Sequence, residues 1–336
     1  MSSAQLTIAG HDIGAEHLPF VIAEAGSNFN QSLDIAKQLI DVAAASGAQA
    51  VKFQLFRAEA LYPPGTEMHD IFKSVELNTD WLAPLNAHAT GRGILFAASV
   101  FDMHSLAALE AIGVPFHKVA SSETTNLRLL GAMAATGRPL LISTGMCESG
   151  DIAEAVNLCR GLGNEDLVLL QCGSRYPLPP EQVNLRTLAG MSAAFDTAIG
   201  FSDHTLGFAA AAAAVALGAR VIEKHFTLDR DMEGPDHSYA LEPAELKSYV
   251  ETVNEAFAAL GSPRKAMLAE ERAVGRRNGL YAARAIAAGA EIETADIAVR
   301  RPATGIDERY ARAVVGARAA QAIDEGEAIG WGLVDF

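Results

Sequence analysis

Short apolar runs recur along the chain at intervals of roughly 20 to 45 residues, with helix-like stretches between them. Nearly every run ends in polar residues that could take part in catalysis: Glu24, Lys52–Gln54, Ser99, Ser121–Glu123, Ser143–Thr144, Gln171–Ser174, Ser202–His204 and Glu223–His225. Such alternation predicts repeated βα units around a parallel sheet. About eight units predict a (β/α)₈ TIM barrel, whose active site forms at the C-terminal ends of its strands.

Apolar residues at helical spacing predict helices near residues 33–46, 79–91, 103–112, 126–136, 150–161, 184–195, 207–217 and 242–260. The segment 57–79 contains Pro63-Pro64-Gly65 and no strong period, which predicts a long loop serving as a lid or substrate wall. The predicted division is a barrel at 1–262, a charged linker at 263–277 and a small β-rich domain at 278–336. Within that domain, Ala285–Ile292 resembles Ala322–Ile329.

The net charge of −15 argues against nucleic acid or an anionic membrane as the main partner. It does not exclude an anionic substrate, because a few lysines can set the potential inside a cleft. Cys147, Cys159 and Cys172 form no pattern, which predicts reduced thiols in a cytoplasmic protein, with Cys172 in the core rather than acting as a nucleophile. We expect no signal peptide and no membrane span, because no apolar run approaches the roughly 20 residues that a span needs.

Two histidines are candidate metal ligands. His204 and His225 are separated by about one βα repeat, which predicts equivalent heights on neighbouring strands. Two imidazoles there could hold one ion and leave positions open for water and substrate, as in a catalytic metal site. The alternative is a pair of hydrogen-bonded histidines without a metal.

Lys52 and Lys118 are candidate anion-binding groups, because a lysine at a barrel mouth can hold phosphate or carboxylate. One of them could instead form a Schiff base, or each could form a structural ion pair, for example with Glu24 or Glu223. Strand alternation places Lys224 on the opposite face from Glu223, so Lys224 is the weakest candidate. Hydroxyls at the same level complete a possible anion cradle: Ser99, Ser121, Ser143, Thr144 and Ser202.

Several motifs occur in order: Ile22–Asn28, Val51–Gln54, Lys118–Ser121, Ser143–Met146, Gly200–Thr205, Glu223–Thr227 and Gly234–Asp236. On these motifs the chain resembles the sialic acid synthase family, which makes nonulosonic acids, from near His17 to the end. Its C-terminal part resembles the antifreeze-like (SAF) domain of that family, with Arg300-Arg301-Pro302 at the expected place.

The resemblance implies condensation of phosphoenolpyruvate with an N-acylated amino sugar and release of phosphate. It also implies a divalent metal, Mn²⁺ before Mg²⁺ or Co²⁺, held by His204 and His225. Phosphoenolpyruvate would bind on Lys52, Lys118, Ser99, Ser121, Ser143 and Ser202, while Glu24, Gln54, Ser174, Tyr176, Glu223 and Asp236 would bind or orient the sugar or water. Family members are domain-swapped homodimers, so Arg301 would reach the acetamido group of the sugar in the partner's barrel.

The chain departs from the family pattern at Phe29-Asn30-Gln31, at Val100 and at Gln171-Cys172-Gly173-Ser174. Several departures fall where the sugar is expected, so the pattern predicts the reaction type and leaves the sugar open. N-acetylmannosamine, giving N-acetylneuraminate, is the leading expectation, and a 2,4-diacetamido-trideoxyhexose, giving legionaminic or pseudaminic acid, is the alternative. A 6-phosphate sugar is disfavoured because no additional basic cluster is evident. The rival classes are a Schiff-base aldolase and a non-catalytic sugar-binding protein.

Overall fold

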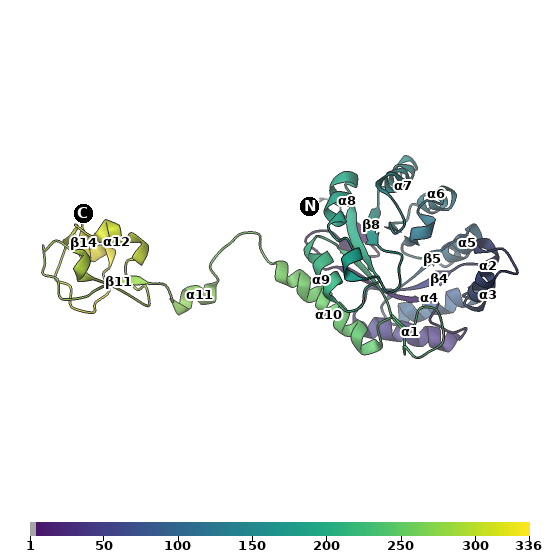
Figure 1. The fold of residues 1–336 in the computed structure, drawn as a ribbon, viewed down its shortest axis with the longest axis horizontal. Helices are drawn as coiled ribbons and strands as arrows, with labels where there is room; N and C mark the ends of the chain where they lie inside the picture. Colours follow the sequence, from purple (N-terminus) through teal and green to yellow (C-terminus); the bar gives the residue numbers. More distant parts are fainter. Residues whose placement is uncertain (1–4) are drawn as a thin grey trace. The chain divides into compact units, whose positions relative to one another are not determined.

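The computed structural model describes residues 5–336 and divides into two compact units, Met1–Gly261 and Ser262–Phe336 (Figure 1). Among residues 5–336, no helix is both long enough and apolar enough to cross a bilayer. The first unit carries the repeated βα pattern, and the second carries the glycine-rich sequence at the C-terminal end.

The first unit is a closed barrel of parallel strands in the order β10-β3-β4-β5-β6-β7-β8-β9. The strands are β3 (Phe20–Gly26), β4 (Ala50–Leu55), β5 (Leu95–Val100), β6 (His117–Val119), β7 (Leu140–Ser143), β8 (Leu167–Cys172), β9 (Ala198–Asp203) and β10 (Val221–His225). The predicted TIM barrel is therefore confirmed. Its parallel strands bring all the polar strand ends noted in the sequence to one end of the barrel.

Helices surround this barrel (Figure 1) and lie close to the predicted ranges: α1 (Leu33–Ser46), α4 (Leu82–Gly91), α5 (Met103–Ala111), α6 (Leu127–Ala134), α7 (Ser149–Gly161), α8 (Thr187–Phe195), α9 (Ala209–Ala216) and α10 (Pro243–Leu260). Local sequence sets their ends. The Ser32 side chain caps α1 by accepting a hydrogen bond from the Ile35 amide, and Gly47 ends the helix at a φ of 85°. The Glu242 and Glu245 side chains form a capping box at the start of α10.

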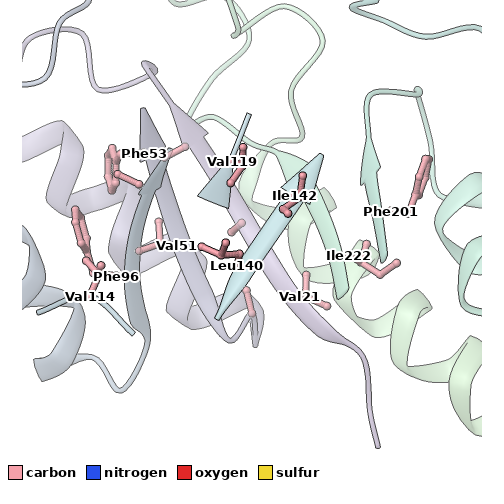
Figure 2. Close-up of a cluster of buried hydrophobic side chains, with 14 of the residues drawn as sticks. Val21, Val51, Phe53, Phe96, Val114, Val119, Leu140, Ile142, Phe201 and Ile222 are labelled. Carbon is pink, nitrogen blue, oxygen red and sulfur yellow. The ribbon is translucent and has the colours of Figure 1, made fainter. Parts of the chain in front are cut away.

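Two apolar layers stabilise the barrel. The larger lies between the strands and the helices and includes Val51, Phe96, Ile142 and Ile222 (Figure 2). The smaller fills the barrel interior and includes side chains of an N-terminal hairpin formed by β1 (Leu6–Ile8) and β2 (His11–Ile13). This hairpin is absent from the elements predicted from the sequence. The apolar cluster includes residues from the start of several strands, such as Phe20, Ala50 and Leu141, so it packs below the polar strand ends.

The segment between β4 and α4 is more ordered than expected. It contains α2 (Ala58–Leu61), α3 (Glu67–Ser74) and the 3₁₀ turn η1 (Thr79–Trp81), whereas the sequence predicted a loop without regular structure. The loop prediction was wrong because α3 is only eight residues long, so the helical spacing of Met68, Ile71 and Phe72 is too brief to stand out after Pro63-Pro64-Gly65. Its start is nevertheless encoded, since the Thr66 hydroxyl caps it by accepting from the His69 amide.

The second unit contains less strand than predicted. Its strands β11 (Gly279–Ala282), β12 (Ile297–Arg300), β13 (Arg318–Ala319) and β14 (Val334–Asp335) form two antiparallel pairs, and its helices are α11 (Ala269–Val274) and α12 (Ala311–Val314). The internal repeat has a structural basis. Ile286 and Ile323 are paired by an antiparallel bridge, and both lie in the same core as Ile292 and Ile329. The two copies therefore place apolar side chains equivalently.

Candidate active site

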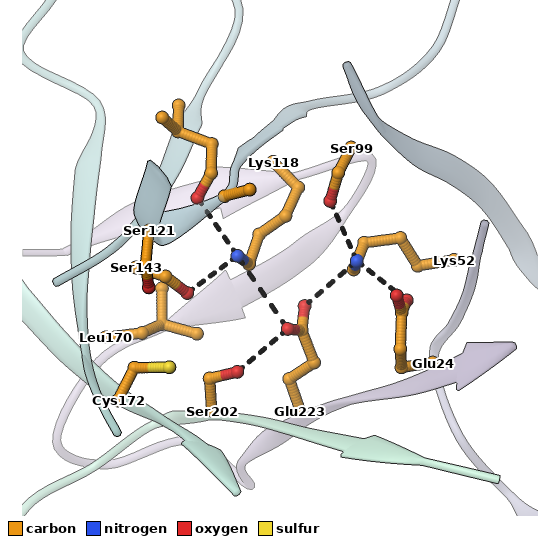
Figure 3. A network of polar contacts seen from close by, with 12 residues as sticks. Glu24, Lys52, Ser99, Lys118, Ser121, Ser143, Leu170, Cys172, Ser202 and Glu223 are labelled. Carbon is orange, nitrogen blue, oxygen red and sulfur yellow. Dashed lines mark hydrogen bonds and ion pairs between the residues drawn. The ribbon is translucent and has the colours of Figure 1, made fainter. Parts of the chain in front are cut away.

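The predicted lysines lie inside the barrel on strands β4 and β6, and both face one carboxylate (Figure 3). The Nζ of Lys52 lies 3.8 Å from one carboxylate oxygen of Glu223, and the Nζ of Lys118 lies 3.7 Å from the other. Lys52 also pairs with Glu24 at 2.7 Å. All four side chains are buried. Two buried lysines are therefore paired with two buried glutamates inside the barrel.

Hydroxyl groups surround these side chains. The Nζ of Lys52 donates to Ser99 Oγ at 2.8 Å, and the Nζ of Lys118 donates to Ser143 Oγ at 2.7 Å. The hydroxyl of Ser202 donates to Glu223 at 3.0 Å. Two lysines and three hydroxyls therefore meet on neighbouring strand ends, as required for binding an anion with several oxygens.

Two further predicted serines converge above Gly145. The amide of Gly145 donates to Ser121 Oγ at 3.0 Å. A Cβ atom at Gly145 would lie 2.5 Å from Ser174 Oγ and 2.8 Å from Ser121 Oγ, so no larger residue fits between these hydroxyls. Gly145 is not among the predicted site residues, although it lies in the Ser-Thr-Gly-Met motif.

The two buried carboxyls near the lysines differ in protonation. Burial raises the pKa of Glu24 to about 7, against the opposing effect of Lys52. Burial alone would also raise the pKa of Glu223, but Lys118 and Lys52 outweigh it and lower that pKa to about 2. Glu223 therefore stays ionised, whereas Glu24 can hold or release a proton near neutral pH. Environments that separate two carboxyl pKa values in this way are typical of acid–base sites.

The two predicted histidines are neighbours. Strands β9 and β10 pair Ser202 with Glu223 and Asp203 with Lys224, so His204 and His225 follow at the same level. Their ring centroids are 5.5 Å apart. The structure thus brings together the pair inferred from the sequence spacing.

The histidines could hold a metal ion. The Nδ1–H of His204 donates to the Gly173 carbonyl at 2.7 Å, which fixes the tautomer and directs the Nε2 lone pair away from that bond. The Nδ1 of His225 is buried and has no hydrogen-bond partner among residues 5–336. Burial lowers the pKa of His225 to about 3, so its imidazole is neutral, the form that binds metals. Among the described residues, no group of three or more His, Cys, Asp or Glu side chains is placed to hold a metal ion.

A second group of side chains meets beside the histidines. The side-chain amide of Gln54 donates to Glu24 at 3.3 Å. A Cβ atom at Gly26, whose φ is +54°, would lie 2.9 Å from Asp236 Oδ2 and 3.7 Å from both Gln54 and Glu24. Glu24, Gln54 and Asp236 therefore lie around the same position above Gly26. Their role in orienting sugar or water stays a prediction.

Aromatic rings enclose the histidine pair. The ring of Tyr176 lies 4.1 Å from that of His204, between centroids, and 5.4 Å from that of Tyr239. Tyr239 also packs edge-on against His225 at 5.4 Å. Tyr239 is not among the predicted site residues, and the sequence signal for it is its place three residues after Asp236 in the segment that follows the last strand.

The sequence placed Lys224 and Cys172 away from the reaction centre, and the structure supports this for Lys224 only. Lys224 lies on the outer face as predicted, where its Nζ pairs with Asp203 at 3.2 Å beneath the ring of Tyr249. Cys172 is buried as predicted, but its Sγ lies 3.8 Å from His204 Nδ1. Burial opposes ionisation of Cys172, yet the contacts with His204 and Ser121 and the nearby charge of Lys118 together outweigh it and lower the pKa of the thiol. Cys172 therefore lies at the edge of the candidate site.

The residues that depart from the family pattern mostly serve to connect loops. The ring of Phe29 is buried against Phe53 and Trp81. Asn30 donates to the carbonyl of Glu233 at 3.0 Å, and Gln31 donates to the carbonyl of Glu76 at 2.8 Å. Of two further departures, Val100 is fully buried, and the partly buried Gln171 donates to the carbonyl of Val183 at 2.9 Å.

Arg301 lies in the second unit, at the end of β12. Its Nε donates to Asn278 Oδ1 at 2.9 Å, and its side chain is exposed. The structure therefore leaves Arg301 accessible to a ligand.

Comparison with known proteins covers both units. The model of the NeuB family matches residues 39–265, and the model of the SAF domain matches residues 277–335. The N,N'-diacetyllegionaminic acid synthase of Legionella pneumophila is 36% identical over 339 residues, which is 95% of this chain and 95% of that protein. The human N-acetylneuraminate-9-phosphate synthase is 39% identical over 284 residues, which is 80% of this chain and 79% of that protein.

The chain is also similar to a solved structure of a protein with a related name. The N-acetylneuraminic acid synthetase of Leptospira borgpetersenii has a TM-score of 0.77 and 33% identity, covering 81% of this chain and 95% of that chain. The C-terminal unit is accordingly an SAF domain, as the sequence predicted.

Proposed function

The chain belongs to the NeuB family, and on that premise we propose that it condenses phosphoenolpyruvate with an N-acylated amino sugar to give a nonulosonic acid and phosphate. The observation that carries the proposal is the placement of two buried lysines with three hydroxyls beside a pair of neighbouring histidines. Lysines and hydroxyls suit the phosphate and carboxylate oxygens of phosphoenolpyruvate. The histidines suit a divalent cation, with Mn²⁺ preferred.

In this reaction, C3 of phosphoenolpyruvate bonds to the aldehyde carbon of the open-chain sugar, and water adds at C2. Phosphate then leaves by cleavage of the C–O bond. A metal on His204 and His225 would supply Lewis-acid polarisation of the aldehyde. Lys52 and Lys118 hold the anionic substrate, while Glu24, with a pKa of about 7, holds or accepts a proton beside the sugar.

The sugar is proposed to be unphosphorylated. In the 57–79 segment, Arg57 is paired with Asp102 at 3.3 Å and Lys73 with Glu76 at 2.7 Å. These basic side chains are therefore already neutralised and are poor receptors for a sugar phosphate. N-acetylmannosamine, giving N-acetylneuraminate, is the first candidate substrate.

A second candidate is a 2,4-diacetamido-trideoxyhexose, the sugar that would lead to legionaminic acid. It is favoured by relatives named N,N'-diacetyllegionaminic acid synthase, which match 95% and 92% of this chain. The test is phosphate release from phosphoenolpyruvate against a panel of both sugars and N-acetylmannosamine 6-phosphate, with and without Mn²⁺. Release with an unphosphorylated N-acyl sugar supports the proposal, whereas release only with the 6-phosphate would contradict the choice of sugar.

The rival Schiff-base chemistry makes a different prediction. A lysine that forms an imine with pyruvate is trapped by borohydride as a stable adduct. We expect no adduct on Lys52 or Lys118, because both are bound to serines and to Glu223 within the anion cradle. Mass spectrometry after borohydride treatment with pyruvate checks this, and a modified lysine would favour an aldolase.

The SAF domain is proposed to act in trans, with Arg301 bound to the acetamido carbonyl of a sugar in the partner's barrel. A heterodimer of Arg301→Ala and His225→Ala subunits, purified through two different tags, tests the proposal. Its swapped arrangement places both lesions at one barrel and leaves the other intact, so we expect about half of the wild-type activity. Each homodimeric variant serves as the inactive control, and an inactive heterodimer would show that the domain acts in cis.

A further inference from the structure

The segment after β10 is fixed at both of its ends. Phe226 and Leu241 form a parallel bridge, and the amide of Leu241 donates to the carbonyl of His225 at 3.0 Å. Between them, the ring of His237 is hydrogen-bonded to Thr227 Oγ1 at 2.7 Å and to Asn30 Oδ1 at 2.9 Å. The backbone that carries Asp236 and Tyr239 is therefore held directly beside His225.

Within this segment, the carboxylate of Asp236 accepts a hydrogen bond from Tyr239. The hydroxyl of Tyr239 donates to Asp236 Oδ1 at 2.5 Å, and no other hydrogen-bond donor to this carboxylate is found in residues 5–336. The other oxygen, Oδ2, lies 4.0 Å from His225 Nδ1 and faces the space above Gly26. The bond to Oδ1 thus leaves Oδ2 directed towards the candidate reaction centre.

The ring of Tyr239 has a separate contact. It is 9% exposed and packs edge-on against His225, with 5.4 Å between ring centroids. The hydroxyl and the ring therefore act on two neighbouring functional groups, the Asp236 carboxylate and the His225 imidazole. A change that removes only the hydroxyl separates these two contacts.

We propose that Tyr239 is a positioning residue that aims Asp236 Oδ2 at the bound sugar or water. This inference rests on the proposed function. A carboxylate without its hydrogen-bond donor can rotate into the neighbouring space, and small errors in the placement of a reacting group lower the rate of the chemical step. The phosphoenolpyruvate cradle lies on other strands and keeps its contacts.

The variant Tyr239→Phe removes the hydroxyl and retains the ring. We expect kcat to fall about tenfold, the loss typical of a hydrogen bond to a charged group, with the KM for phosphoenolpyruvate within about twofold of wild type. Tyr249→Phe is a matched control, because the Tyr249 hydroxyl also donates to a buried aspartate, Asp203, at 2.9 Å but on the outer face of the barrel. The control should lose thermal stability and keep its kcat.

A double-mutant cycle with Asp236→Asn distinguishes positioning from general support of the fold. We expect Tyr239→Phe to cost about tenfold in kcat in the wild-type background and less than about twofold in the Asp236→Asn background. An equal loss in both backgrounds, or a Tyr239→Phe enzyme with wild-type kcat, would overturn the inference while leaving the proposed function intact. A wild-type protein that releases no phosphate with any sugar would overturn both.

Discussion

Replacing Lys118 by methionine is expected to lower kcat/KM for phosphoenolpyruvate at least about tenfold, because each charge-assisted contact to an anion contributes roughly 1.5–3 kcal/mol. The Nζ of Lys118 donates to Ser143 Oγ and to the Val119 carbonyl, and burial lowers its pKa. Methionine keeps most of the side-chain volume and removes the charge. Steady-state kinetics with phosphoenolpyruvate as the varied substrate measures the loss.

Lys224→Met is the matched control for this variant. Lys224 is also a buried lysine paired with an acid, Asp203, but it lies on the outer face of the barrel. Its removal should lower the melting temperature, because it leaves the Asp203 carboxylate buried without its cation. It should leave the KM for phosphoenolpyruvate within about twofold of wild type. A Lys118→Met enzyme in which only the KM for the sugar rises would show that the anion cradle has been assigned to the wrong substrate.

The second large effect is expected from His225→Ala. A bound cation that polarises a carbonyl contributes several kcal/mol to the transition state, so its loss should lower kcat by about 10³-fold or more. Binding of Mn²⁺, measured by calorimetry without any substrate, should be lost in the same variant. His88→Ala is the matched control, because His88 is a histidine hydrogen-bonded to Asp41 on the outer helices. It should bind Mn²⁺ like the wild type.

Removal of the metal by a chelator tests the same prediction independently. Wild-type protein stripped with a chelator should be inactive, and added Mn²⁺ should restore it. Full activity in the stripped sample, or unchanged Mn²⁺ affinity in His225→Ala, would remove the metal from the mechanism.

The fold and the candidate site were predictable from the sequence to different extents. The barrel follows from a repeat of apolar runs and helical periods, which depends on burial alone and is visible along the chain. The pairing of His204 with His225 and the outward position of Lys224 follow from the register and alternation of parallel strands. These features are local in sequence or repeat at a fixed spacing.

The features that the sequence did not predict depend on contacts between distant segments or belong to elements too short to show a clear period. The N-terminal hairpin of β1 and β2 is short, and its side chains become core only inside the closed barrel. Helix α3 is only eight residues long, so the helical spacing of Met68, Ile71 and Phe72 is too brief a signal to distinguish it from a loop. Tyr239 gains its role only because the Leu241 bridge places it against His225. Spacing along the chain contains no signal for that contact.

The most direct test of the central claim is the fate of the bridging oxygen of phosphoenolpyruvate. Substrate labelled with ¹⁸O between C2 and phosphorus is incubated with the protein, Mn²⁺ and an N-acyl amino sugar, and the products are analysed by mass spectrometry. Condensation with C–O cleavage predicts that the label appears in the released phosphate, in a one-to-one ratio with a nonulosonic acid. Unlabelled phosphate, or phosphate released without the sugar, would contradict the account.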